Sequence, residues 1–532
     1  MSEVKAQITD PNSLVEYGFN RVIITITAIL CALLEIIDTT IVNVALNDIR
    51  GSLGATLTDV AWVITAYAIA NVIIIPMTGW LSKQFGRRNY FAASIVIFTV
   101  TSFLCGNATN IWELVAFRFI QGMGGGALLV TAQTIITESY PIEKRGMAQA
   151  IYGMGVIVGP TLGPPLGGYL VDNYSWRDIF YINIPVGIAA IILTILFVKS
   201  PKYGDKLKAK QVDWLGIGLL AAFIGSLQFV LEHGQQDDWF EEPLIVALSI
   251  VSLFGFVAFI WRELVYEHPV VNLRVLRDGN LNVGTLMTFI LGFGLYGSTF
   301  IIPIYTQSIL GWTATDAGLL LIPSSITTGL MMPIIGKLLQ KGVPQKYLVI
   351  GGFTTFFLYS LWMYLLMTPD TGAEHFFWPL VVRGIGLGLL FVPITTLSLS
   401  TLQGKDIGDG AAFTGMMRQL GGSFGIAIIT TFITRISMQH RVDLISNITP
   451  IKYKVQQQLA ATQQMFMSKG FSSNEALDKA HKMLDLSITK QSTVLAYMDV
   501  FLYLGILFLL CVPFVMLIKK GAGKVDMSNA AH

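Results

Sequence analysis

Charged residues are scarce in this sequence of 532 residues: only 13% are Asp, Glu, Lys or Arg, whereas 53% are hydrophobic. Soluble proteins carry about 25% charged residues, so this chain has too little charge to cover a surface that faces water on all sides. Lipid must therefore be part of its solvent. The formal net charge of +2 is small and gives no reason to expect a nucleic-acid partner.

Cysteines and metal-binding patterns are equally sparse. The three cysteines, Cys31, Cys105 and Cys511, all fall within apolar runs and are far apart in sequence, which argues against a disulfide framework and a metal site. The six histidines lie in loops, at the edges of apolar runs or at the end of the chain. Neither HExxH nor GxxxxGK(S/T) occurs. We therefore predict no cofactor, no metal and no enzymatic activity, and the sequence disfavours a nucleotide-driven pump.

Long apolar runs, in contrast, are abundant. A bilayer crossing needs about 20 mostly apolar residues. Fourteen runs reach this length: 21–46, 59–81, 89–107, 112–137, 146–171, 179–198, 213–232, 243–262, 281–309, 316–339, 347–367, 376–401, 411–436 and 494–518. We therefore predict an all-α integral membrane protein with 14 transmembrane helices.

The remaining charges are distributed unequally between the loops. If both termini are cytoplasmic, the inner loops are basic, as in SKQFGRR (82–88) and QKGVPQK (340–346). The outer loops, such as EHGQQDDWFEE (232–242), are neutral or acidic, with Arg50 and Arg177 as isolated exceptions. The positive-inside rule therefore predicts that both termini are cytoplasmic.

Two motifs recur in the same order in the two halves of the chain. PMTGWLSKQFGRRNY (76–90) returns in weaker form as PIIGKLLQKGVPQKY (333–347), and FRFIQGMGGGALLV (117–130) returns as VRGIGLGLLFVPIT (382–395). Parallel internal repeats are characteristic of secondary transporters. They divide the fourteen helices into six, two inserted and six.

This division predicts five regions. They are a cytoplasmic N-terminal segment (1–20), an N-terminal six-helix bundle (21–198), two inserted helices with their flanking loops (199–280), a C-terminal six-helix bundle (281–518) that includes an extracytoplasmic helical loop (437–493), and a cytoplasmic tail (519–532).

Two acids stand in the first apolar run, LLEIIDTTIVNVAL (33–46). Glu35 and Asp38 are three residues apart, so they lie on one helical face. A charge at membrane depth costs at least about 2.5–3.5 kcal/mol on insertion scales, and such residues usually mark an ion or substrate pathway. The alternative is that they are structural partners of a basic residue elsewhere.

The fifth run, GMGVIVGPTLGPPLGGYL (153–170), is rich in glycine and proline. Small residues allow membrane helices to approach closely, and we expect GMGGGA (122–127) to supply the facing surface. The run is either a tight packing seam or a bending element that controls access.

The loop GWLSKQFGRR places a tight turn at Gly86 and two arginines, Arg87 and Arg88, at the start of the third helix. These arginines either anchor the helix by snorkelling or pair with carboxylates in one conformation only, as a latch.

Six motifs, in order, resemble those of the fourteen-helix drug:proton antiporter branch of the major facilitator superfamily, and within it the EmrB-type efflux pumps. They are IIDTTIVNVAL, GWLSKQFGRR, FRFIQGMGGGAL, GVIVGPTLGPPLGG, WRDIFYINIPVG and RQLGGSFGIAI. The resemblance covers residues 20–518. It departs at Lys83, where the family usually has an acid, so that a carboxylate–arginine latch is absent or uses another acid. Asn47 replaces a frequent proline, and Glu35 is an addition to the motif.

The resemblance implies proton-coupled export of lipophilic drugs across the bacterial inner membrane by alternating access. It assigns proton coupling to Asp38 and Arg118. The role of Glu35 is not inherited from the family; we expect it to be a second acid that serves as a further proton site or as a counter-charge for a cationic substrate. The resemblance also implies conformational motifs at Gly79, Gly86, Arg87, Arg88, Gly155, Gly159, Pro160 and Gly163. The alternative is a proton-coupled symporter or an exporter of one metabolite.

Further polar and aromatic residues are candidates for the substrate site. We expect Glu35, Asn43, Gln121, Phe293, Tyr296 and Met417 to contact substrate. Arg383 and Arg418 are weaker candidates for tuning the carboxylates; alternatively, they anchor helices or pair with loop acids. The aromatic and methionine side chains of the later helices line a broad apolar pocket or serve as ordinary packing.

The segment 437–493 has amphipathic helical character, and we expect it to form a helical pair that projects outward. Because EmrB-type pumps work with a periplasmic adaptor and an outer-membrane channel, the resemblance implies that this projection is their docking surface. The alternative is a mobile outer loop.

Overall fold

The structure is a computed structural model that describes residues 14–201, 212–402, 406–448 and 452–515. Within these ranges it consists of helices and connecting turns, without strands. Among the described residues, fourteen helical segments are long and apolar enough to cross a bilayer, which confirms the number predicted from the sequence. The predicted tail 519–532 and most of the basic loop 199–210 lie outside the described residues.

The first six spans pack together as one set of helices. In this set α2 packs against α5, α6 and α8, and α5 lies between α3 and α4. A short 3-10 turn, η1 (Ile142–Lys144), precedes α6. The set comprises α2 (Gly18–Leu53), α3 (Leu57–Phe85), α4 (Arg87–Gly106), α5 (Ile111–Ser139), α6 (Arg145–Asn173), and the consecutive helices α7 (Asp178–Tyr181) and α8 (Asn183–Phe197).

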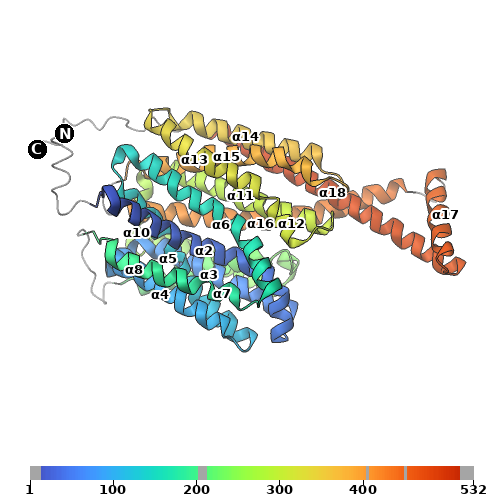
Figure 1. Cartoon of the computed structure of the whole chain (residues 1–532), viewed down its shortest axis with the longest axis horizontal. Coiled ribbons are helices and arrows are strands. Elements are labelled where there is room, and N and C mark those ends of the chain that lie inside the picture. Colours follow the sequence, from blue (N-terminus) through green and yellow to red (C-terminus); the bar gives the residue numbers. More distant parts are fainter. Residues whose placement is uncertain (1–13, 202–211, 403–405, 449–451, 516–532) are drawn as a thin grey trace, which may run out of the picture.

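The last six spans form a second set. Here α11 packs against α15 and α16, and α14 packs against α15 and α18. The N-terminal helices lie along one side of the molecule, and the helices of the second set along the other (Figure 1). The second set comprises α11 (Gly279–Ser308), the consecutive α12 (Ala314–Leu319) and α13 (Ile322–Gln340), α14 (Gln345–Leu366), α15 (Ala373–Leu399), α16 (Asp406–Asn447) and α18 (Ser473–Val515).

Two helices, α9 (Trp214–His233) and α10 (Pro243–Val265), separate these sets in sequence, with the 3-10 turns η3 (Trp239–Glu241) and η4 (Leu273–Arg277) beside them. α9 contacts α3 of the first set and α16 of the second. α10 is largely exposed, as in the side chain of Phe254, which is 70% exposed. An exposed apolar helix in a membrane protein faces lipid, so α10 is peripheral.

The internal repeat has a structural counterpart where the two sets meet. Gly79 of α3 lies against Asp409 of α16, and a Cβ atom at Gly79 would lie only 2.5 Å from Asp409 Oδ1. In the second set, Gly336 of α13 lies against Met147 and Ala150 of α6. Each Pro-x-x-Gly helix therefore presents its glycine to the opposite set, which allows close approach of the backbones.

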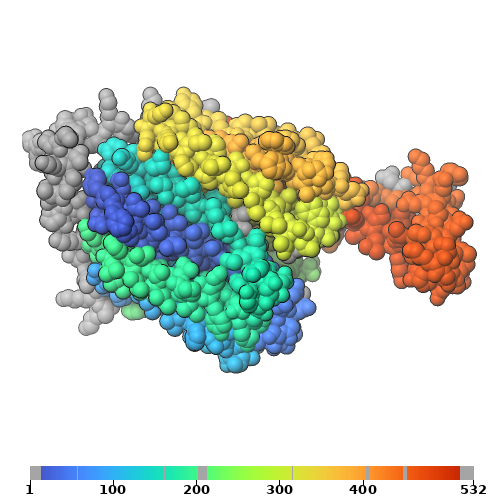
Figure 2. Space-filling view, viewed as in Figure 1, coloured from blue at the N-terminus to red at the C-terminus, as the bar shows by residue number. Residues whose placement is uncertain are grey.

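The helices α16 and α18 extend well beyond the bundle and carry α17 (Tyr453–Ser468) at the tip of the projection (Figures 1 and 2). An ion pair between Arg441 and Asp485, with 2.6 Å between Nη2 and Oδ1, joins the two long helices. The described residues of the segment 437–493 are thus mainly helical, as we expected, and its first and last parts are continuations of α16 and α18. No glycine or proline interrupts the sequence between 437 and 447, so the membrane helix continues past the apolar run.

Candidate functional site

Asp38 is fully buried in α2 and accepts hydrogen bonds from three side chains. Arg118 Nη1 donates to Oδ2 at 2.5 Å, Gln121 Nε2 donates to Oδ1 at 3.0 Å, and Asn183 Nδ2 donates to Oδ1 at 2.7 Å. Charge-assisted hydrogen bonds of this kind compensate for the loss of water around a buried carboxylate. The structure therefore brings together Asp38, Arg118 and Gln121, which we had singled out in the sequence.

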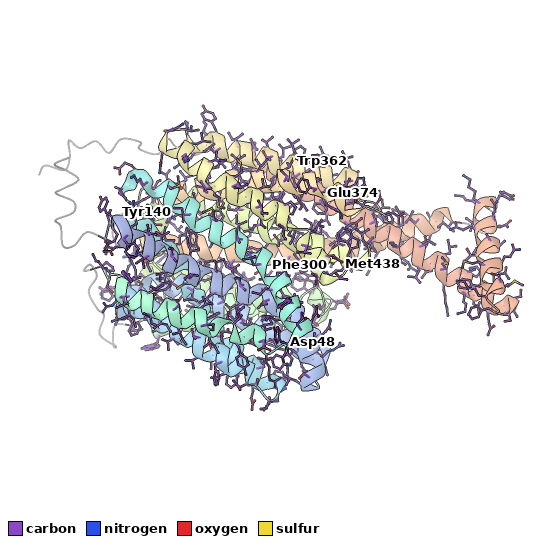
Figure 3. All side chains as sticks on the ribbon, in the orientation of Figure 1. Asp48, Tyr140, Phe300, Trp362, Glu374 and Met438 are labelled. Atoms are coloured by element: carbon purple, nitrogen blue, oxygen red, sulfur yellow. The ribbon has the colours of Figure 1, made fainter. Side chains whose placement is uncertain are left out.

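The depth of this cluster follows from helix geometry. Asp38 is 20 residues from the first residue of α2 and 15 from the last, so at 1.5 Å per residue it lies about 30 Å and about 22 Å from the two ends. Asp48, near the far end of α2, and Tyr140, beyond the end of α5, mark opposite ends of the bundle (Figure 3). The carboxylate thus lies well inside the membrane-spanning region.

Arg118 is held from several directions. Its Nε donates to the carbonyl oxygen of Val63 at 3.2 Å and its Nη1 to Gln121 Oε1 at 2.8 Å, while the guanidinium lies 4.1 Å from the ring centroid of Tyr67. Arg118 and Gln121 are three residues apart on α5, so both reach the same neighbouring helix. Ser102 of α4 accepts a further hydrogen bond from Gln121 Nε2 at 2.7 Å.

Glu35 lies one turn before Asp38 but belongs to different surroundings. It is 9% exposed, and its Oε1 accepts a hydrogen bond from Asn71 Nδ2 of α3 at 3.1 Å. Arg118 donates to Asp38 rather than to Glu35. Glu35 accepts a side-chain hydrogen bond from one neighbour, whereas Asp38 accepts them from three. The cost of burying the carboxylate is therefore less compensated at Glu35 than at Asp38.

Sequence reasoning missed Asn71 and Asn183, which bond the two acids. Asn183 lies in WRDIFYINIPVG, a segment that we used only for the family resemblance. Both residues carry the same signal as Glu35 and Asp38: a polar side chain inside an apolar run. Applying that criterion to amides as well as to charges would have found them.

The other substrate candidates lie at different places. Tyr296 and Phe293 of α11 pack against Gly422 and Gly425 of α16, and Met417 of α16 is half-buried. Asn43 is exposed on α2 and does not join the hydrogen-bond network around Asp38. Tyr305, another aromatic residue of α11, donates to the carbonyl oxygen of Thr368 at 2.6 Å and packs against Tyr497.

Arg383, the repeat counterpart of Arg118, forms no hydrogen bond with an acid among the residues that the structure describes. Its Nε donates to Ser298 Oγ and its Nη1 to Ser324 Oγ, both at 2.9 Å, and its Nη2 donates to Thr299 Oγ1 at 2.5 Å. Hydroxyl groups of α11 thus take the place that Asp38 of α2 occupies in the first set. Among the described residues, the buried pair of Asp38 and Arg118 therefore has no counterpart at Arg383.

The loop between α3 and α4 contains the expected tight turn. It also forms an ion pair in which this loop supplies the basic residue and the other helix set supplies the acid. Gly86 has φ +83°, a conformation that favours glycine. Lys83 Nζ contacts both carboxylate oxygens of Asp409 at 2.7 Å, so the residue that replaces the family's acid pairs with an acid of the other set. Arg87 pairs with Glu138 within the first set, whereas Arg88 is exposed.

Reversing the pair of Lys83 and Asp409 tests whether it holds the two sets together. Each single change, Lys83→Asp or Asp409→Lys, removes the attraction between the two helix sets at this end of the bundle. We expect the equilibrium between the joined and the separated arrangement of the sets to shift by about tenfold or more, because a charged hydrogen bond contributes about 1.5–3 kcal/mol. The double variant should recover the transport rate of the wild type, because it restores opposite charges at the two positions. Transport rates in vesicles at matched expression measure this; a double variant as slow as the single ones would contradict it.

The glycines of α6 form a face that receives α2. Added Cβ atoms at Gly155 and Gly159 would lie 3.1 Å and 2.5 Å from Cγ2 atoms of Ile29 and Ile36, respectively. Gly163, one turn further, faces Thr40. Pro160 lies within the same helix, which continues through it to Asn173. The helix that carries Asp38 therefore packs directly against this glycine face.

Our expectation that GMGGGA faces α6 was wrong. A Cβ atom at Gly126 would lie 2.6 Å from the carbonyl oxygen of Asn71 in α3, and one at Gly124 would lie 2.9 Å from the amide nitrogen of Phe98 in α4. Because α5 lies between α3 and α4, its glycines allow close packing against these two helices. Glycine content indicates close packing, but it does not identify the neighbouring helix.

Two repeated sets of membrane helices, with buried charges inside, define a secondary transporter. The family model of the Major Facilitator Superfamily matches residues 28–426, and the chain belongs to this superfamily. It is a multi-pass protein of the bacterial inner membrane.

Several known proteins are similar over nearly the whole chain. The chain is 32% identical to multidrug export protein EmrB of Escherichia coli K12 over 517 residues, covering 97% of this chain and 98% of that protein. It is 34% identical to fatty acid resistance protein FarB of Neisseria gonorrhoeae over 497 residues, or 93% and 96% of the two chains. These matches confirm the resemblance to EmrB-type proteins.

Among solved structures, the human organic anion transporter MFSD10 (TETRAN) matches with a TM-score of 0.57 at 11% identity, covering 92% of this chain and all of that one. A likeness at this level of identity concerns the fold alone. It supports the arrangement of two helix sets.

Proposed function

We propose that this chain is a proton-coupled multidrug exporter, which moves lipophilic compounds out across the inner membrane in exchange for protons. The observation that carries the proposal is the buried carboxylate of Asp38, hydrogen-bonded by Arg118, Gln121 and Asn183 at membrane depth. The relatives that are named for multidrug export and fatty acid resistance support lipophilic substrates.

Asp38 is the proton carrier in this proposal. Its hydrogen-bond partners belong to α5 and α8, which lie in the same helix set as α2. A shift of α2 along the glycine face of α6 changes the distance from Asp38 to Arg118, and therefore changes the affinity of the carboxylate for a proton. A proton that moves inward under 100 mV releases about 2.3 kcal/mol, which is available to export substrate.

Alternating access needs contacts that open at one end of the bundle while others close. The pair of Lys83 and Asp409 joins the sets at the end that we predict to be cytoplasmic, and Asn272 Nδ2 donates to Asp409 Oδ2 at 3.3 Å beside it. The close contact between α6 and α13 around Gly336 is a further contact between the two sets. We infer that these contacts break when the transporter opens to the cytoplasm.

The projection of α16, α17 and α18 is the proposed docking surface for a periplasmic adaptor, which would hand substrate to an outer-membrane channel. It exposes the apolar side chains of Met438, Val442 and Leu486, which are 63%, 67% and 70% exposed. Exposed apolar groups of this kind mark interaction surfaces. Deleting α17 should leave transport in vesicles intact while lowering drug resistance of whole cells; equal losses in both would contradict this role.

Transport into inverted membrane vesicles tests the proposed function. A pH gradient, acidic inside, is imposed on vesicles that contain the full chain, and uptake of the neutral lipophilic dye Nile red is followed by fluorescence. We expect uptake that stops when nigericin collapses the gradient. Uptake that is unaffected by nigericin, but requires a co-transported solute, would instead indicate a different coupling.

A further inference from the structure

The two inserted helices, α9 and α10, are held together at the end that we predict to be cytoplasmic. Asp213 is the N-cap of α9 and accepts a hydrogen bond from the backbone amide of Gly216 at 2.9 Å. Arg262, in the last turn of α10, donates from Nε to both carboxylate oxygens of Asp213, at 3.1 Å and 3.0 Å. A charged pair of this kind joins the start of α9 to the end of α10.

Glu263 lies next to Arg262 in sequence, but its hydrogen bond leads away from the two helices. Its side chain is fully buried, and its Oε2 accepts from the backbone amide of Val271 at 3.2 Å. Val271 follows the end of α10 at Val265, in the segment that leads to α11. A buried carboxylate is costly unless it is bonded, and Arg262 already joins the helices. Glu263 therefore fixes the segment that follows them.

The segment that Glu263 fixes is packed where the two helix sets meet. Val270 and Val271 are 2% and 3% exposed. They belong to a buried apolar cluster that also contains Ile75 of α3, in the first set, and Ile407 of α16, in the second. The chain that leaves the inserted helices is therefore held on one side by a carboxylate of α10 and on the other by both sets.

The next residue, Asn272, reaches the ion pair that joins the sets. Its Nδ2 donates to Oδ2 of Asp409 at 3.3 Å, and Lys83 Nζ lies 2.7 Å from both oxygens of the same carboxylate. A carboxylate accepts several hydrogen bonds, and a second donor restricts Asp409 to the orientation in which the flexible Lys83 reaches both oxygens. These three residues are called the inner gate below.

We propose that the inserted helices control the inner gate, because they position Asn272 on the carboxylate of Asp409. Glu263 fixes the segment 270–273, and this segment brings the amide of Asn272 to its acceptor. Glu263 and Asn272 are thus positioning residues of the conformational cycle. The proposal rests on the proposed export function, and it gives a gating role to a helix pair that lies outside the two repeated sets.

The rate at which a buried cysteine is alkylated tests the proposal in the purified full-length protein. The reference carries Met77→Cys, because Met77 of α3 is 5% exposed and belongs to the same apolar cluster as Val271, so that N-ethylmaleimide reaches it when the inner ends of the sets part. Mass spectrometry separates it from the three native cysteines, which are buried. Asn272→Ala, Glu263→Ala, Glu263→Gln and the double alanine variant are compared with the control Glu267→Gln, an exposed acid after α10.

We expect Asn272→Ala to raise the alkylation rate by about 3–10-fold, the effect of losing one hydrogen bond of ordinary strength. Glu263→Ala should raise it similarly, whereas Glu263→Gln keeps an acceptor for the amide of Val271 and should stay close to the reference. Because Glu263 acts through Asn272, adding Glu263→Ala to Asn272→Ala should give no further increase. Glu267→Gln should leave the rate unchanged.

Two results would overturn the proposal. An unchanged rate in Asn272→Ala would show that its bond to Asp409 does not hold the sets together. An equal increase from Glu263→Ala with and without Asn272→Ala would show that Glu263 supports the bundle in general. If Glu263→Ala does not fold, Glu263→Asp, whose side chain is too short to reach Val271, takes its place. Failure of the proposed export function is distinguishable, because it would appear as a lack of gradient-driven uptake of Nile red by the wild type, whereas alkylation needs neither gradient nor substrate.

Discussion

Asp38→Asn is expected to abolish proton-driven accumulation of substrate while leaving exchange of substrate for substrate intact. Asparagine keeps the shape and can still accept from Gln121 and Asn183, but it cannot take up a proton. A proton that crosses 100 mV supplies about 2.3 kcal/mol, which corresponds to about a 50-fold concentration ratio. The accumulation ratio in energised inverted vesicles should fall by this factor for each proton lost.

The matched control for this variant is Asp48→Asn, since Asp48 lies on the same helix but is exposed near its end (Figure 3). It should accumulate substrate as the wild type does. Asp38→Glu, which restores a carboxylate, should recover part of the accumulation. Normal accumulation by Asp38→Asn at matched expression would show that the coupling proton binds elsewhere.

Gly163→Ala is expected to remove most transport activity although it adds only one methyl group. The added Cβ atom would lie 2.8 Å from Cβ of Thr40 on α2, so the helix that carries Asp38 must move away from α6. Overpacking of this kind costs about 1–3 kcal/mol, which is about a 5- to 150-fold change in a conformational equilibrium. Initial uptake rates in vesicles, normalised to the amount of folded protein, measure the effect.

Two further variants make this test specific for the contact between α6 and α2. Gly168→Ala, on the same helix, is the control, because its Cβ atom would approach Thr315 Oγ1 no closer than 3.4 Å; it should transport normally. Adding Thr40→Gly to Gly163→Ala should restore activity by returning the lost space. If Gly163→Ala transports as fast as Gly168→Ala, the glycine face does not control the movement of α2.

The sequence predicted the membrane fold and the acids because both are local signals. Apolar runs of bilayer length identify spans by composition alone, and an acid within such a run is visible without knowing its neighbours. The bounds of α16 and α18 were less predictable, because a helix ends where its hydrogen bonds are capped rather than where hydropathy falls. Ser472, which accepts from the Glu475 amide at 3.4 Å, supplies such a cap for α18.

The remaining features depend on contacts between distant residues. Lys83 and Asp409 are separated by 326 positions, so the sequence indicated a substituted latch but not its partner. The glycines of α5 and α6 predicted close packing but not which helices meet. Arg418 of α16 has Tyr152 of α6 and Tyr296 of α11 as its polar neighbours, and the sequence did not indicate either of them. Tertiary placement, which pattern and propensity do not specify, decided each of these cases.

The most direct test of proton-coupled export is whether binding of substrate displaces a proton from Asp38. Nile red is added to the purified full-length protein in weakly buffered solution, and the release of protons is recorded with a pH-sensitive dye. If Asp38 exchanges its proton for substrate, the wild type should release protons when it binds Nile red, and Asp38→Asn should release none. Equal release by both proteins, or no release from a wild type that exports Nile red in vesicles, would contradict proton exchange at Asp38.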